Sequence, residues 1–488
     1  MTGPEIALYA LGVVIFLAAI FVSIALHELG HLYFAKKFGC RVSQYMVGFG
    51  PTVWSRKKGE TEYGIKLVPL GGYVKIIGMF PPETDREQQI SRGEQVPAAD
   101  PSDTAAAPAH QDAHSDVRVV AGAATPDAPL TLRKSNTGLF AQMVSQTRAA
   151  EFELVEPWDA DRLFYKLPAP KKILVMLAGP GVNIALAFLC FLCVYGIYGV
   201  HSVEPTGRPA VSVVSDCVIP QDAKRTACQD SDQVSPARAA GLQPNDLVVS
   251  FNGQPVASWS QLSDLIHANG SSVAVMEVER DGKLVKLQAA HSIAMPRDLD
   301  GEGPGQTATV GFLGVEPESR EVVTRHGPVY TLERMGEMTG HAVSSIVQLP
   351  ARVYNIAQAI FGQGERAQDG PMSVIGGSRL AGEVAASTRP GLDIGGKAAL
   401  LGLVVGSFNL FIGVFNLIPL LPLDGGHIAG SAFEGTRRWL AQRLRRPDPG
   451  HVNVARQLPV AYVIGFAMLS MSLVLMVGDI VVPLKSGL

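Results

Sequence analysis

Two histidines and a glutamate stand together in the stretch HELGH, residues 27–31, at the end of a long apolar run. Positions four apart share one face of a helix, so the imidazoles of His27 and His31 can bind the same metal ion. Glu28 lies beside them and can take a proton from a metal-bound water. The alternative is a pair of surface histidines, but ionisable groups in lipid usually mark function. The spacing therefore predicts a hydrolytic metal centre, and zinc suits these ligands.

A catalytic zinc ion needs a third protein ligand and keeps a fourth position open for water. The stretch NLIPLLPLDGGH, residues 416–427, offers Asp424 and His427. Pro419 and Pro422 interrupt helical hydrogen bonds, and irregular backbone at membrane depth is tolerated only beside protein or a watery cavity. Asp424 is the preferred ligand because it lies nearer the apolar run, and His427 is the alternative.

The elements that must position these residues are apolar. Four stretches carry no charged residue and reach the roughly 20 residues that a helix needs to cross a bilayer: 6–26, 173–200, 398–423 and 457–478. Buried helices of a soluble protein are the alternative, but four such runs argue against them. The 488-residue chain has a mean hydropathy of +0.19, so it is too apolar for an ordinary soluble protein. Its net charge of −3 and the lack of a basic stripe argue against a nucleic-acid binder.

Basic residues set the expected orientation of the four spans. Lysines and arginines gather after the first span, before the second, and between the third and fourth. The positive-inside rule therefore places both termini outside, the loops 36–172 and 424–456 in the cytoplasm, and 201–397 outside. Both halves of the metal site then lie at the same cytoplasmic depth. Glu5, which stands where a signal peptide has basic residues, argues against a cleaved leader.

The loop between the first two spans has three parts. Residues 60–78 predict two short strands around Leu70-Gly71-Gly72. Residues 82–136 are rich in Ala, Asp, Pro, Ser and Gln and poor in large apolar residues, which is typical of a disordered insert. Aromatic residues and leucines return over 138–165 and favour one or two helices on the bilayer surface.

The external segment has a regular pattern over residues 235–288. The pattern predicts, in order, a helix at 236–240, a strand at 247–251, a helix at 260–268, and two strands joined by Asp281-Gly282. This order resembles a PDZ domain. Such a domain binds peptide ends at a sheet edge, and it can also act as a steric filter.

The five cysteines fit this topology. Cys40 lies on the cytoplasmic side, and Cys190 and Cys193 lie in the second span. Cys217 and Cys228 are the two in the external segment, where an oxidising compartment favours a disulfide between them. Two free thiols are the alternative.

The motifs also carry a family resemblance. HELGH in a first span, with NLIPLLPLDGGH in a later one, resembles the site-2 proteases, intramembrane zinc metalloproteases of the M50 type. VGFGP, PLGGYVKIIGM, LAGPGVN and GPMSVIGG agree with the family, whose first span is followed by a membrane-re-entrant β-hairpin. The chain is similar to bacterial regulator-of-sigma-E proteases, and most similar in style to actinobacterial members with a single PDZ domain. It departs from the tandem PDZ pair of the enterobacterial protease.

The resemblance implies the roles of the metal-site residues. His27, His31 and Asp424 bind one zinc ion per chain. Glu28 is the general base and later the proton donor.

The resemblance also implies a substrate-binding set. Asn416 holds the substrate backbone, with an interhelical hydrogen bond as the alternative. The strands at 60–78, with Gly71, Gly72 and Tyr73, clamp an extended substrate by edge pairing. Asn183 is structural, beside a helix-packing glycine.

The expected architecture is a polytopic α-helical membrane protein with four transmembrane helices, a re-entrant β-hairpin and one extracytoplasmic α+β PDZ domain. In chain order the expected segments are 1–81 with the first span and the hairpin, 82–136 as the insert, and 137–200 with an interfacial helix and the second span. They continue with 201–335 as the PDZ domain, 336–430 with an amphipathic segment and the third span, and 431–488 with a basic loop and the fourth span.

The implied function is proteolysis within the plasma membrane, with the active site near the cytoplasmic side. The expected substrate is a single-span membrane protein of the anti-sigma-factor type, already trimmed outside by an upstream site-1 protease. Two other classes stay open: a membrane metal-ion carrier that uses the same ligands, and a catalytically dead PDZ receptor that depends on residues 235–288. The intact H-E-x-x-H argues against both.

Overall fold

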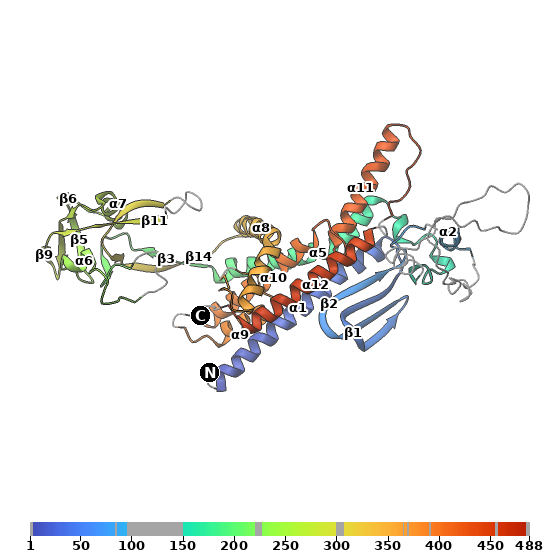
Figure 1. The fold of residues 1–488 in the computed structure, drawn as a ribbon, viewed down its shortest axis with the longest axis horizontal. Helices are drawn as coiled ribbons and strands as arrows, with labels where there is room; N and C mark the ends of the chain where they lie inside the picture. Colours follow the sequence, from blue (N-terminus) through green and yellow to red (C-terminus); the bar gives the residue numbers. More distant parts are fainter. Residues whose placement is uncertain are drawn as a thin grey trace, which may run out of the picture. The chain divides into compact units, whose positions relative to one another are not determined.

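The computed structural model describes residues 3–82, 85–94, 150–219, 227–298, 307–364, 366–367, 370–389, 392–453 and 457–484. The chain forms two compact units, which we call the helical unit and the β-rich unit (Figure 1). The helical unit combines Met1–Tyr198 with His326–Leu488, and the β-rich unit is Gly199–Arg325. The β-rich unit therefore ends before the expected boundary at residue 335.

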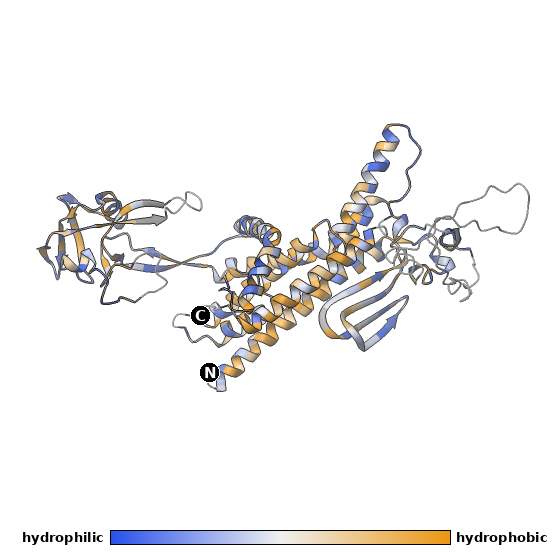
Figure 2. Ribbon diagram, viewed as in Figure 1, coloured by the Kyte–Doolittle hydropathy of each residue, from blue (hydrophilic) through white to orange (hydrophobic). Residues whose placement is uncertain are grey.

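Four helices of the helical unit are long and apolar enough to cross a membrane. They are α1 (Gly3–Lys37), α5 (Ala169–Cys193) with a π-helical turn at Val194–Tyr198, α10 (Ile394–Asn416) and α12 (Leu458–Val481). Figure 2 shows hydrophobic residues along these helices. The prediction of four membrane-length helices is confirmed. The shorter helices α2 (Asp85–Ser91), α9 (Val374–Ala386) and α11 (Asp424–Arg443) and the long helix α8 (Pro328–Ile360) complete the unit.

The prediction that the third span continues to residue 423 is wrong. α10 ends at Asn416, and residues 417–423 form a turn into α11. Pro419 and Pro422 have no backbone N–H, so they cannot continue the helical hydrogen bonds. The lack of charge identifies apolar sequence, but it does not mark where a helix ends.

α1 packs closely against α5 and α9 along its length. Gly12 lies against the backbone of Ala381 in α9, where a Cβ atom on Gly12 would also stand 2.7 Å from the Cβ of Ala385. Phe16 is fully buried and meets the Phe408 ring of α10 edge-on, with centroids 5.1 Å apart. The tight contact fixes α1, which carries HELGH, between its neighbours.

An antiparallel sheet of β1 (Val42–Lys58) and β2 (Thr61–Ile76) lies beside α1. Both strands bend, so the first part of β1, residues 42–47, has a partner on each side. It pairs with 72–76 on one side and with 62–65 on the other. The second part of β1 then pairs with the first part of β2, from Thr52↔Lys66 to Lys58↔Thr61.

The two strand segments expected around Leu70-Gly71-Gly72 are present, but the prediction missed their partner. They do not pair with each other, because the first part of β1 lies between them. The sheet therefore begins at Val42, well before residue 60.

Part of the expected insert, 82–136, is folded. α2 forms at its start, and Ile90 packs onto the cluster of Ile77, Phe152 and Leu163. The prediction of disorder is therefore wrong at α2, where one apolar side chain anchors the helix, and residues 95–136 lie outside the described part.

One or two helices are expected over 138–165, of which the structure describes residues from 150 onward: residues 150–152 are helical, and two short 3-10 turns follow. The 3-10 turns are Pro157–Asp159 and Phe164–Lys166. Arg41 binds the fully buried Asp159 at 2.5 Å, which ties the first turn to the start of β1.

The β-rich unit contains a four-stranded antiparallel sheet in the order β6-β5-β8-β9. Its strands are β5 (Leu247–Phe251), β6 (Gln254–Pro255), β8 (Met276–Arg280) and β9 (Lys283–Lys286). The helices are α6 (Pro236–Ala239) and α7 (Trp259–Asn269). The remaining strands pair two by two: β3 (Val200–Pro205) with β14 (Ser319–Thr324), β4 (Val211–Val214) with β13 (Val315–Pro317), β7 (Val273–Ala274) with β10 (Ala290–His291), and β11 (Ile293–Asp298) with β12 (Thr307–Phe312).

The helices and strands predicted over 235–288 are confirmed one by one in this unit. Phe251, Leu262 and Met276 are almost fully buried and form the centre of its core. Cys217 and Cys228 are joined in a disulfide with their Cα atoms 5.9 Å apart.

The close contact of α1 and α9 predicts a large effect of one added methyl group. We expect Gly12→Ala to destabilise the helical unit by about 1–3 kcal/mol, because its Cβ overlaps the Ala381 carbonyl. Thermal unfolding in detergent measures this effect. Gly340→Ala in α8, where nothing lies within 4 Å of the added atom, is the control and should not lower stability. Equal midpoints for the two variants would contradict the packing argument.

Candidate metal centre

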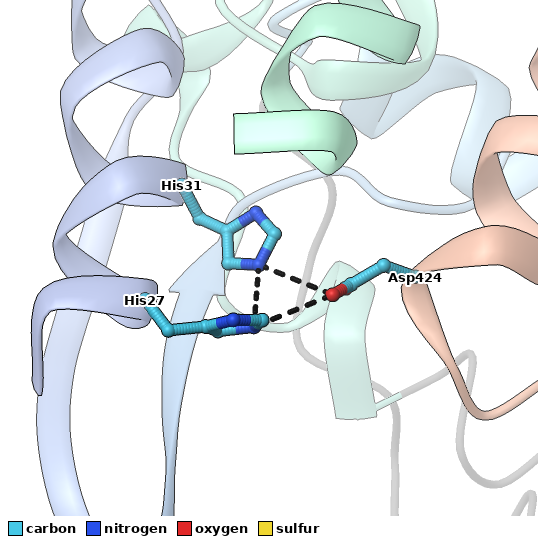
Figure 3. Close-up of side chains that lie close together, drawn as sticks. All are labelled: His27, His31 and Asp424. Atoms are coloured by element: carbon cyan, nitrogen blue, oxygen red, sulfur yellow. Dashed lines mark hydrogen bonds and ion pairs between the residues drawn. The ribbon is translucent and has the colours of Figure 1, made fainter. Parts of the chain in front are cut away.

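His27 and His31 project from one face of α1 toward Asp424, the first residue of α11 (Figure 3). The two Nε2 atoms lie 3.2 Å apart, and each is 3.4 Å from Oδ2 of Asp424. Both imidazoles are buried, and the carboxylate is partly exposed. Residues far apart in the sequence thus bring three ligand atoms into one small triangle.

The size of this triangle fits a tetrahedral zinc ion. Ligand bonds of about 2.0–2.1 Å in a tetrahedron put neighbouring ligand atoms about 3.3–3.4 Å apart. The three observed separations, 3.2, 3.4 and 3.4 Å, are close to that edge length. Oδ2 of Asp424 is buried and has no hydrogen-bond partner among the described residues, as expected of an atom that serves a metal.

Second contacts orient the ligands. Nδ1 of His31 lies 2.8 Å from the carbonyl oxygen of Val175 in α5. A carbonyl can only accept, so Nδ1 carries the hydrogen and Nε2 offers its lone pair to the metal. Burial alone would raise the pKa of the Asp424 carboxyl, but the two facing imidazoles outweigh burial and hold that pKa below its ordinary value. Asp424 is therefore an anionic ligand.

Glycines set the approach of α11. A Cβ atom on Gly425 would overlap the carbonyl of Ile418, and one on Gly426 would lie 2.6 Å from the nitrogen of Leu421. The turn after α10 therefore folds back against the start of α11. This return brings Asp424 toward α1.

His427, the alternative ligand, lines the same cavity but lies outside the ligand triangle. Burial lowers its pKa, so its imidazole is neutral. In the described ranges, the group whose atoms can hold a metal is His27, His31 and Asp424.

A cavity of 880 Å³ opens beside the triangle. The expected residues that line it are Glu28, Gly71, Gly72, Tyr73, Asn416 and the three ligands. Gly72 is so close to the base that a Cβ atom on it would stand 2.9 Å from Cγ of Glu28. One end of β2 therefore adjoins the proposed general base, although Gly72 and Glu28 come from different elements.

Two further residues of α5 belong to the site. Gly179 lies against both imidazoles, and a Cβ atom on it would be 2.7 Å from Nε2 of His27. Asn183 lines the cavity, and its buried Oδ1 has no hydrogen-bond partner among the described residues. The sequence predicts a packing role for both residues. The sequence signal that could have identified the site lies in LAGPGVN, where small residues stand about one helical turn before the polar amide of Asn183.

The family model of Peptidase family M50 matches residues 15–446. The chain belongs to this family. Zinc metalloprotease Rip1 of Mycobacterium tuberculosis (strain ATCC 25618 / H37Rv) is 28% identical over 98% of this chain and 99% of its own length. Zinc metalloprotease RasP of Geobacillus kaustophilus (strain HTA426) is 28% identical over 87% and 89%. Regulator of sigma-E protease RseP of Escherichia coli (strain K12) is 25% identical over 86% and 89%.

This M50 peptidase is a zinc metalloprotease and a membrane protein. Its relatives are named zinc metalloproteases, its ligand triangle fits zinc, and four of its helices have the length and composition of membrane spans. The residues that would hold the zinc are His27, His31 and Asp424.

The position of Gly179 beside both imidazoles predicts that adding a side chain there sharply reduces zinc binding. We expect Gly179→Ala to lower the zinc content of the purified M50 peptidase severalfold, because the added methyl group takes space between the imidazoles. Gly181→Ala is a matched control two residues along α5, where nothing lies within 4 Å of the new atom. Elemental analysis of both variants measures bound zinc. Full zinc occupancy in Gly179→Ala would contradict this assignment.

Proposed function

We propose that this zinc metalloprotease cleaves a peptide bond within the transmembrane segment of a single-span membrane protein. The main support is the position of the ligand triangle. His27 and His31 lie on α1, a helix long and apolar enough to span a membrane, and they adjoin a cavity with a carboxylate base. Ionisable groups in such a helix are costly unless they serve a function.

The residues around the triangle have distinct roles in hydrolysis. Bound zinc supplies a Lewis acid that polarises the scissile carbonyl and lowers the pKa of its water. Glu28 takes the proton of the attacking water and then gives it to the leaving amine. Nδ1 of His31, held by the carbonyl of Val175, keeps this imidazole in the ligand tautomer.

The edge of β2 supports binding of an extended substrate. A transmembrane helix satisfies its own backbone, so its scissile bond is accessible only after it unwinds. Residues 72–76 pair with β1 on one side, and no described strand pairs with their other edge. An unwound substrate can add there as a strand, next to Glu28. Gly71 and Gly72 line the same cavity, and Asn416 offers it an amide that can pair with exposed substrate backbone.

The β1–β2 sheet also has features of a re-entrant hairpin. Val53, Trp54 and Leu67 are each more than half exposed, which is unusual for large apolar side chains in water. Lys57 and Lys58 follow at the turn. An apolar part in lipid and a basic turn at the cytoplasmic surface fit this distribution.

The β-rich unit fits a PDZ domain that filters substrates outside the membrane. The order of α6, β5, α7, β8 and β9 supports this assignment. An untrimmed substrate would then be obstructed until an upstream site-1 protease removes its outer domain. The proposed topology places this unit outside the plasma membrane and the metal centre near the cytoplasm.

The proposed substrate class is an anti-sigma factor. The name of the similar Escherichia coli protein, Regulator of sigma-E protease, supports it. Cleavage would release a product to the cytoplasm, where it frees a transcription regulator.

The role of Glu28 predicts a clean separation of metal binding from catalysis. Glu28→Gln keeps all three ligands, so we expect full zinc content and at least a hundredfold slower cleavage of a pre-trimmed single-span substrate in detergent. Mass spectrometry of the wild-type products locates the cut. Equal cleavage by both proteins would contradict the role of Glu28, and a metal carrier would instead keep its function in this variant.

The proposed topology predicts the redox state of the cysteines in cells. We expect Cys217 and Cys228 to be bridged and Cys40 to be free, because disulfides persist outside the cytoplasm. Alkylation of intact cells under non-reducing conditions, followed by peptide mapping, measures both. Free thiols at Cys217 and Cys228 would contradict the placement of this unit outside.

A further inference from the structure

A buried ion pair joins α5 to α11 away from the metal. Nζ of Lys172 lies 2.8 Å from Oε1 of Glu434, and the two side chains are 5% and 3% exposed. The two residues are 262 positions apart in the sequence. Neither lines the cavity or touches a metal ligand, so the hydrolytic mechanism leaves this pair without a role.

Glu434 is the centre of several contacts. Its Oε1 also lies 3.1 Å from Nδ1 of His451, and its Oε2 accepts the backbone N–H of Val452 at 3.1 Å. Beside it, a Cβ atom on Gly435 would lie 2.9 Å from the Cβ of Ala169. The middle of α11 is therefore fixed both to the start of α5 and to the chain that returns toward α12.

The other end of α11 packs against the turn from α10 and carries the metal ligand. Asp424 is its first residue, and the preceding Leu423 gives no side-chain cap. Glu434 is ten residues further along α11, which at 1.5 Å per residue is roughly 15 Å away. A tilt of about 4° around Glu434 would therefore move Asp424 by about 1 Å. Metal sites tolerate only about 0.2 Å in ligand distance, so the anchor of α11 matters for the triangle.

The same part of α5 also orients His31, one of the two ligands on α1. Val175, whose carbonyl holds Nδ1 of His31, is three residues after Lys172 and lies on the same face of α5. One turn of this helix thus contacts an α1 ligand through Val175 and the helix of Asp424 through Lys172. Both parts of the ligand triangle, the α1 histidines and Asp424 of α11, are therefore anchored to the same helix, α5.

We propose that the Lys172–Glu434 ion pair is a positioning device that holds Asp424 in register with His27 and His31 and thereby retains the zinc. A buried ion pair is weak evidence for net stability, because well-packed apolar residues often do as well. Its role here is to set the orientation of α11. A charged pair is satisfied in one alignment of α11 on α5, whereas apolar side chains can pack in several alignments. The proposal concerns metal retention and does not depend on the substrate.

The test measures zinc release without any substrate. Zinc-loaded Lys172→Met and Glu434→Gln, purified in detergent, are mixed with an excess of a chromogenic chelator, and the release rate is followed. We expect release at least about tenfold faster than in the wild type, the effect typical of residues that support metal ligands. Cobalt-substituted protein gives a second readout, because its visible absorption changes when a ligand moves.

Arg366 and Asp479 provide the matched control. They form an equally buried pair, 2% exposed on each side and 2.7 Å apart, which joins the segment before α9 to α12 and makes no described contact with α1, α5 or α11. Arg366→Met should lower the unfolding temperature as Lys172→Met does, yet leave the zinc release rate and the cobalt spectrum as in the wild type.

The outcomes separate positioning from general stability. Faster release in both Lys172→Met and Glu434→Gln, with a changed cobalt spectrum and an unaffected Arg366→Met, supports the proposal. Wild-type release and spectrum in the Lys172 and Glu434 variants, or equal acceleration in Arg366→Met, would overturn it. If Lys172→Met does not fold, Glu434→Gln decides alone, because its amide keeps the size and the Val452 contact. A failed cleavage assay would bear only on the proposed substrate.

Discussion

The structure depends on bringing a carboxylate to two histidines at the end of an apolar helix. Three polar atoms within 3.4 Å of one another would be costly there without a metal, and they must come from α1 and α11, which are nearly 400 residues apart in sequence. Neither helix can meet this requirement alone. α5 positions both α1 and α11. It orients His31 through Val175, leaves space for the imidazoles at Gly179, and contacts α11 through Lys172.

The same constraint shapes the cavity. Because Gly179 has no side chain, the imidazoles lie against the α5 backbone, and their open side turns toward the space lined by Glu28 and Asn416. Gly72 does the same in β2, where the sheet comes close to Glu28. Glycine thus permits close approach at two points of the site, and in both the neighbour is a group with a chemical role.

Much of this could be predicted from local sequence, because the signals are periodic or compositional. The spacing of His27 and His31 places them on one helical face, and runs without charge predict four membrane-length helices. The strands of the β-rich unit follow from turns such as Asp281-Gly282. Most of what failed depends on partners distant in sequence. The start of the sheet at Val42 was missed because its strand partners lie after residue 60. The sequence predicts only a packing role for Gly179, because the imidazoles that it adjoins lie on another helix. α10 was extended past Asn416 because hydropathy ignores the missing N–H of proline.

The fold of the site also explains why an extended strand, rather than a helix, suits its cavity. A helical segment presents side chains and no free backbone groups, whereas residues 72–76 have one edge that pairs with no described strand. In the proposed binding mode, a substrate that pairs there would exchange its helical hydrogen bonds for sheet hydrogen bonds, so unwinding would leave few polar groups unsatisfied. That exchange occurs next to Glu28, since Gly72 lies both on the strand and against this side chain. In the proposed mechanism, the strand edge and Glu28 therefore act on the same stretch of substrate, and the unwinding that would make a peptide bond accessible would also bring it to the metal site.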